Sequence, residues 1–78
     1  MKAKILNVGS YGVRIETRVL ESSGSHYHIP YKDIIRLDNS TLTVSLADYG
    51  LADETMELEQ SEQLEQLRGI YESNTKEH

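Results

Sequence analysis

Two closely spaced histidines are the first candidates for chemistry in this 78-residue chain. On a strand His26 and His28 would face the same way, about 6–7 Å apart. Such a pair could take part in a zinc site. Zinc needs three or four ligands and the chain has no cysteine, so a carboxylate from elsewhere would have to complete the set. We therefore expect no metal and no cofactor, and we interpret the pair as exposed side chains.

A strip of mixed charge precedes the histidines. Arg14, Glu16 and Arg18 alternate with aliphatic residues in the segment 12–20, which predicts a strand with one polar face. Mixed signs of this kind are typical of a solvated sheet face. The alternative is an anion-binding strip for a small ligand or nucleotide, with the polar loop 22–25 closing over the ligand in a homo-oligomer. This alternative ligand-binding site consists of Arg14, Arg18, His26 and His28.

The charges divide the chain into two unequal halves. Residues 1–37 hold six basic and three acidic residues, a net charge of +3, whereas residues 38–78 hold two basic and ten acidic residues, a net charge of −8. The two halves could pair within the fold, or the acidic half could face a basic partner. Direct binding of nucleic acid is disfavoured at a net charge of −5, because phosphate contacts need a basic surplus.

The acidic half provides a candidate protein-binding site. On a strand Glu57 and Glu59 would lie about 6–7 Å apart, a spacing comparable to a phosphate step. A row of such carboxylates could imitate nucleic acid and dock in a basic groove; the alternative is an ordinary soluble outer face. The residues predicted to bind a partner are Glu54, Glu57, Glu59, Glu62 and Glu65.

The pattern of the first twenty residues predicts a hairpin. Residues 2–8 and 12–20 form its strands, and Gly9 and Gly12 stand at the two ends of its turn. We expect positive backbone angles at these glycines.

The central segment predicts further strands. Residues 27–46 alternate apolar and polar residues on both sides of a bend at residues 38–40, and the segment 41–47 is the clearest strand of the chain. Pro30 favours an edge strand or a break, because proline cannot donate a ladder hydrogen bond. Asp48-Tyr49-Gly50 then repeats the pattern of Ser10-Tyr11-Gly12 and predicts another turn.

The C-terminal segment allows two interpretations. Residues 54–59 alternate like a short strand, after which Ser61 could cap a helix that extends to Tyr71. The alternative is one continuous helix from residue 53. We favour the strand followed by a helix, with Gly69 marking close packing against the sheet. The prediction is thus a small α+β fold, an antiparallel sheet of four or five strands with one C-terminal helix, as a single domain over residues 1–73 with a frayed tail at 74–78.

The order of these segments resembles a shortened bacterial pleckstrin-homology-like domain. The resemblance covers residues 12–72 and rests on Ile29, Tyr31, Asp33, Ile34 and Leu37, then Leu42, Val44 and Leu46, then SEQLEQL at 61–67. It implies a sheet capped by a C-terminal helix. The basic lipid-headgroup loop of that family is replaced here by SSGS, so the resemblance implies protein binding rather than lipid binding.

Composition limits the function further. The sequence shows no phosphate-binding loop, nucleophile elbow or other catalytic constellation, so we expect no enzyme. No apolar run near the N-terminus is long enough for a signal peptide or a membrane span, which predicts a cytoplasmic protein without membrane contact. A short chain without Phe or Trp has a thin core, which favours a homodimer or a bound partner. These features predict a non-catalytic protein-binding module, of the kind that phages or mobile elements use to inhibit a basic, nucleic-acid-handling host protein in restriction or CRISPR defence.

Overall fold

One mixed sheet and one helix form the fold. The computed structural model describes residues 2–18 and 24–76. The strands are β1 (Lys2–Val8), β2 (Gly12–Arg18), β3 (His26–Pro30), β4 (Ile34–Asp38), β5 (Thr41–Val44) and β6 (Glu54–Leu58). Helix α1 spans Glu62–Lys76, and two 3-10 turns, η1 (Tyr31–Asp33) and η2 (Ala47–Tyr49), join strands. The predicted α+β fold with a C-terminal helix is confirmed, although the described residues form six strands rather than four or five.

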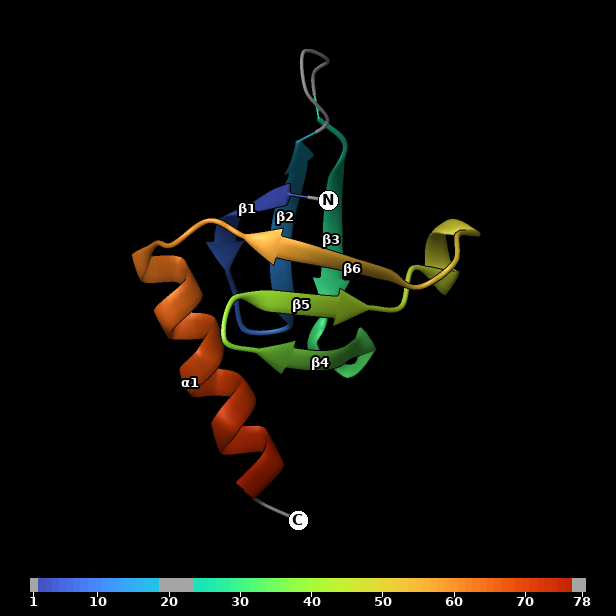
Figure 1. Ribbon diagram of the computed structural model, residues 1–78. Coiled ribbons are helices and arrows are strands. Elements are labelled where there is room, and N and C mark those ends of the chain that lie inside the picture. Colours follow the sequence, from blue (N-terminus) through green and yellow to red (C-terminus); the bar gives the residue numbers. More distant parts are fainter. Residues whose placement is uncertain (1, 19–23, 77–78) are drawn as a thin grey trace.

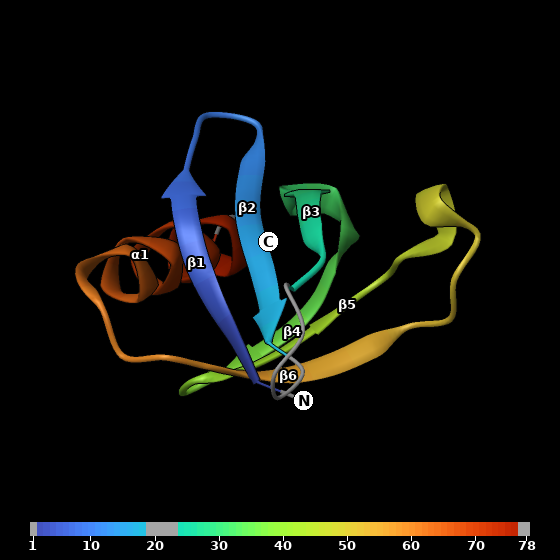
Figure 2. The same ribbon diagram turned by 90° about the horizontal axis from the view of Figure 1, so that it is seen from above.

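The sheet consists of two three-stranded meanders. The strand order is β3-β2-β1-β6-β5-β4. All neighbours are antiparallel except β1 and β6, which run parallel and join the meanders through Lys2 opposite Glu57 and Ala3 opposite Leu58. Figures 1 and 2 show that the meander β1–β3 crosses the meander β4–β6 steeply and faces it, with α1 beside β1 at one side of the enclosed space. The sheet is therefore mixed, and the predicted antiparallel arrangement holds for every pair of neighbouring strands except β1 and β6.

The core fills the space between the two meanders. β1, β2, β5 and β6 contribute alternate apolar residues, as the period of two predicts, whereas β4 contributes only the half-buried Ile34 and Leu37 on either side of an irregularity. The buried hydrophobic residues are Ala3, Ile5, Val13, Ile15, Ile29, Leu42, Val44, Leu46, Met56, Leu58, Leu64 and Leu67. Val19, expected on the same face as Val13, lies outside the described residues.

The break after Pro30 explains the extra strand. β3 pairs with β2 at one edge of the sheet, and β4 pairs with β5 at the opposite edge. Between them the Tyr31 amide donates a hydrogen bond to the Tyr11 carbonyl (3.1 Å), and the Tyr31 hydroxyl donates to the Gly9 carbonyl. The stretch that reads as one strand from residue 27 onward is therefore two strands on opposite edges, and the prediction of an edge strand at Pro30 is confirmed.

Positive backbone angles occur at two of the described residues. Asn39, in the turn between β4 and β5, has a φ of 59°, and Gly50, after η2, has a φ of 72°. The expectation of positive φ at Gly9 and Gly12 is wrong. Gly12 is required for another reason, since a Cβ there would lie 2.3 Å from the carbonyl oxygen of Ile29.

The C-terminal segment is a strand followed by a helix, as favoured from the sequence. The Leu64 amide donates to the Ser61 hydroxyl (3.2 Å), which confirms the predicted cap. The helix continues to Lys76, beyond the end predicted at Tyr71; residues 77–78 of the predicted tail lie outside the described residues. Gly69 does not mark close packing, because a Cβ there would meet no atom within 4 Å. Within residues 2–18 and 24–76, no helix is long and apolar enough to cross a membrane.

Candidate functional site

The strip of mixed charge lies on the outer face of β2 and β3. Arg14 is directly opposite His28, and Glu16 is opposite His26, whose Nε2 atom is 3.9 Å from the Glu16 carboxylate. An anion bound here would meet the negative charge of Glu16. The described residues contain no group of three or more His, Cys, Asp or Glu side chains that could hold a metal ion. The strip therefore gives little support to anion binding.

Two parts of the alternative site cannot be placed. The side chain of Arg18 and residues 22–23 of the loop expected to close over a ligand lie outside the described residues. The end of that loop is attached to β2, because the Thr17 amide donates to the Ser25 carbonyl (2.9 Å) and the Thr17 hydroxyl donates to it as well (3.3 Å).

The five predicted carboxylates do not form one row. Glu57 lies on the outer face of β6, and Glu59 is exposed just beyond its end. Glu54, the first residue of β6, lies on the opposite face of the strand from Glu57, the face that is turned towards the core. Glu62 and Glu65 occupy the first turn of α1, where carboxylates favour the positive end of the helix dipole.

Glu57 is bonded within the fold. Its carboxylate accepts hydrogen bonds from the Ser40 hydroxyl and from the Thr41 hydroxyl (2.9 Å). These two bonds lower the pKa of Glu57 below its ordinary value of 4.5, and the charge of Lys2 on the neighbouring strand adds to the effect. Basic and acidic halves of the chain thus meet at the β1–β6 pair, and Glu57 joins β6 to β5.

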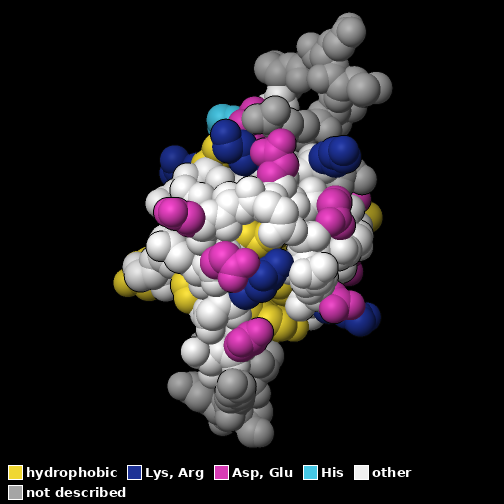
Figure 3. All heavy atoms as spheres, turned by 60° about the vertical axis from the view of Figure 1, so that its left-hand side comes forward, with side chains coloured by type: hydrophobic (Ala, Val, Ile, Leu, Met, Phe, Trp, Pro, Cys, Tyr) yellow, Lys and Arg dark blue, Asp and Glu magenta, His cyan; other side chains and the backbone are white. Residues whose placement is uncertain are grey.

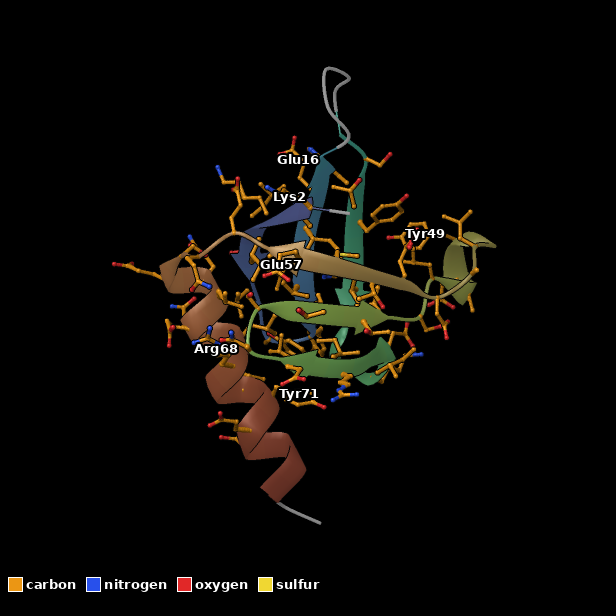
Figure 4. The ribbon with its side chains drawn as sticks, in the orientation of Figure 1. Lys2, Glu16, Tyr49, Glu57, Arg68 and Tyr71 are labelled. Atoms are coloured by element: carbon orange, nitrogen blue, oxygen red, sulfur yellow. The ribbon has the colours of Figure 1, made fainter. Side chains whose placement is uncertain are left out.

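Arg68 attaches the helix to the turn between β4 and β5. Its guanidinium donates to the Asn39 carbonyl (3.0 Å), to the Asn39 side-chain oxygen (3.1 Å) and to the Glu65 carboxylate (2.7 Å). In Figure 4 the side chain reaches from α1 towards this turn. Glu65 is therefore partly neutralised, whereas the exposed carboxylates of Glu59 and Glu62 make no ion pair or side-chain hydrogen bond with a described residue.

An open hollow of about 730 Å³ lies on the face of α1 next to the end of β1. Its lining residues are Val8, Glu65, Gln66, Gly69, Ile70 and Ser73. Glu62 lies one turn before Gln66 on the same helix face. Figure 3, which looks onto the side where α1 lies, shows hydrophobic side chains (yellow) exposed between scattered carboxylates (magenta). This hollow was not predicted from the sequence; its one local signal is a glycine inside a segment of good helix formers.

A second, smaller cavity of about 150 Å³ lies where β6 begins. It is lined by Thr17, Tyr27, Leu46, Leu51, Ala52, Glu54 and Met56. Tyr49 fixes the neighbouring loop to the edge of β3: the His28 amide donates to the Tyr49 hydroxyl (3.0 Å), which donates to the His28 carbonyl (3.3 Å). The rings of Tyr49 and Tyr27 pack edge to face, with their centroids 5.1 Å apart.

Comparisons with known proteins add no assignment to this geometry. No protein-family model, no curated protein and no solved structure matches the chain. The resemblance to pleckstrin-homology-like domains therefore stays a prediction, and the two surfaces beside α1 and at the start of β6 are the candidates from which function is inferred.

Proposed function

We propose that this protein is a non-catalytic binding module that docks a basic segment of a partner protein on the exposed face of α1. The observation that supports this most is the hollow at Gly69, whose apolar lining from Val8 and Ile70 has the carboxylate of Glu65 beside it. Stable protein interfaces combine a central pocket that takes an apolar anchor with a polar rim. An apolar side chain flanked by Lys or Arg has the matching chemistry.

The carboxylates at this end are available for such contacts. Glu62 can pair with a partner without losing an internal bond, and the side chain of Glu65 is 66 % exposed although it contacts Arg68. The excess of acidic residues after residue 37 would also steer a basic partner towards the molecule, an effect that weakens as salt rises.

The partner class that fits this surface is a basic, nucleic-acid-handling protein. A groove that evolved for phosphates has the charge to accept carboxylates, while the net charge of −5 disfavours direct contact of this chain with nucleic acid. In this proposal the protein acts as an inhibitor of the anti-restriction or anti-CRISPR type, as phages and mobile elements encode. Nucleotide binding by Arg14, His26 and His28 has less support because Glu16 lies among them.

The test begins with capture of partners from a host lysate at low and at high salt, followed by affinity measurements on the purified partner. The informative variant is Gly69→Met, which fills the hollow and places a better helix former in α1. We expect this variant to be at least as stable as the wild type and to lose at least about tenfold in affinity, since a hot-spot pocket accounts for 2 kcal/mol or more.

A charge pair completes the test. Glu62→Lys should weaken binding several-fold at low salt, whereas Asp48→Lys, the same charge change on an exposed residue of η2, should leave it unchanged. Equal losses in the two variants would mean that net charge rather than this face determines binding. Full affinity of Gly69→Met would remove the hollow from the proposal.

A further inference from the structure

The core side of β6 begins with a carboxylate. Glu54 is paired with Val44 on β5, and residues directly opposite in an antiparallel pair share one face of the sheet. Val44 is fully buried, and Met56, two residues after Glu54, is buried as well. Glu54 therefore points to the interior side of the strand, at the position where the sheet opens to solvent.

This carboxylate lines the small cavity opposite α1. The other walls are mainly apolar and come from Tyr27 on β3, Leu46 after β5 and Met56 on β6. The loop that closes the cavity is held by the two hydrogen bonds of Tyr49 to β3. Figure 4 shows Tyr49 on the side of the molecule away from the helix. The walls thus come from both meanders and from one anchored loop.

The volume limits what can enter. A cavity of about 150 Å³ is the size that accommodates a benzene-sized apolar group. Pockets for drug-sized ligands begin at about 300 Å³. A nucleotide is therefore too large, and a chain of about four carbon atoms fits.

The charge limits the ligand further. Glu54 has no ion pair or side-chain hydrogen bond with a described residue, so none of the described side chains supplies a counter-ion for its charge at the cavity. An anion would be repelled, and a purely apolar ligand would remove water from the carboxylate without replacing its hydrogen bonds. A short apolar chain that ends in a cation can contact the apolar walls and at the same time pair with the carboxylate.

We propose that this cavity binds an alkylammonium group, with the hydrocarbon chain against Leu46 and Met56 and the ammonium group on Glu54. Two sources have this chemistry, a free aliphatic amine and the lysine side chain of another protein. The site lies away from the hollow on α1, so it does not depend on the docking proposed there.

The experiment follows the methionine methyl groups by NMR. The chain has two methionines, Met1 and Met56, so a selectively ¹³C-methyl-labelled sample gives a direct probe in the cavity wall. We expect n-butylammonium chloride to shift the Met56 signal saturably, and 1-butanol, a neutral ligand of the same size, to bind at least about tenfold more weakly, because a charge-assisted hydrogen bond is lost.

Matched variants assign the effect to Glu54. Glu54→Gln should reduce the affinity for butylammonium at least about tenfold, whereas Glu59→Gln, the same charge change on an exposed residue beyond the strand, should leave it unchanged. Equal binding of butylammonium and butanol, equal losses in the two variants, or no shift of Met56 would each overturn the proposal.

The source of the group is then read from two further ligands. Nα-acetyl-lysine N-methylamide presents the lysine side chain with its backbone, and putrescine presents a free diamine. Tighter binding of the lysine derivative supports a protein ligand, and tighter binding of the amine supports a small molecule.

Discussion

The two ends of the molecule are held together by different forces. At the α1 end, charged groups join the elements: Arg68 binds Asn39 and Glu65, and Glu57 accepts hydrogen bonds from one hydroxyl group in the turn before β5 and from one at the start of β5. At the η2 end, one tyrosine joins the loop to β3 with its hydroxyl and its ring. The first arrangement uses carboxylates that would otherwise be free for a partner, while the second leaves Glu54 without a counter-ion among the described side chains. A charged surface residue therefore indicates a binding site for a partner only if it is not already bonded to another residue of the fold.

Among the changes that test this comparison, removal of Arg68 should cause the largest loss of stability. Arg68→Met retains most of the aliphatic chain but loses three hydrogen bonds to Asn39 and Glu65, which should destabilise the protein by about 2 kcal/mol. Arg36→Met is the control, because the Arg36–Asp38 pair is exposed (70 % and 68 %) and should contribute less than about 1 kcal/mol. Urea unfolding of both variants measures the difference, and equal losses would contradict the role of Arg68.

Tyr49, which holds the η2 end, should contribute less to the stability of the protein than Arg68. Tyr49→Phe keeps the ring contact with Tyr27 but removes both bonds to His28, at a cost of about 1 kcal/mol. Tyr11→Phe is a matched control, since Tyr11 is likewise followed by a glycine but is 84 % exposed. In about 1 M NaCl the loss of stability in Tyr49→Phe should persist, because salt screens interactions between charges and this contact is between neutral groups. A loss that disappears with salt would mean that charges hold this end too.

The two exposed glycines should respond in opposite directions. Gly69→Ala should stabilise α1 by about 0.5–1 kcal/mol, because alanine is the better helix former and nothing lies within 4 Å of the added methyl group. Gly50→Ala should destabilise the η2 end by about 1 kcal/mol, because its φ of 72° is unfavourable for a residue with a Cβ. Thermal unfolding distinguishes them, and a loss of stability in Gly69→Ala would show that the hollow is not open.

The smallest effect is a dependence on pH. Because the pKa of Glu57 is lowered in the fold, its stabilising contribution is complete above its ordinary value of 4.5 and is lost as pH falls through the folded pKa. Stability of the wild type should therefore fall more steeply below pH 4.5 than that of Glu57→Gln. Glu59→Gln, with no such bonds, should keep the wild-type slope, and parallel curves for Glu57→Gln and the wild type would contradict this account.

Local patterns predicted the elements well because local physics determines them. Alternation at 41–44 and at 54–58 identified β5 and β6, and Ser61 identified the start of α1. Asp48-Tyr49-Gly50 forms a turn with a left-handed glycine as expected, whereas Ser10-Tyr11-Gly12, which has the same pattern, does not. Gly12 is required for a different reason, because the backbone of β3 lies too close to it for any side chain.

The arrangement of the elements in space, and which carboxylates form bonds within the fold, could not be predicted from the sequence. The bond from Ser40 to Glu57 spans 17 positions and that from Arg68 to Asn39 spans 29. Contacts at such separations leave no periodic signal in one sequence. The hollow and the cavity were missed for the same reason, since residues from distant segments line them.

The parallel pair of β1 and β6 makes the order of synthesis relevant to folding. Lys2 and its partner Glu57 are 55 positions apart in the chain, so β1 is synthesised well before β6. Until then the first meander has an unpaired edge at β1, the kind of edge that recruits other chains. A second molecule could supply its own β6 and α1 to that edge, so slow or crowded folding should favour exchanged dimers of this protein.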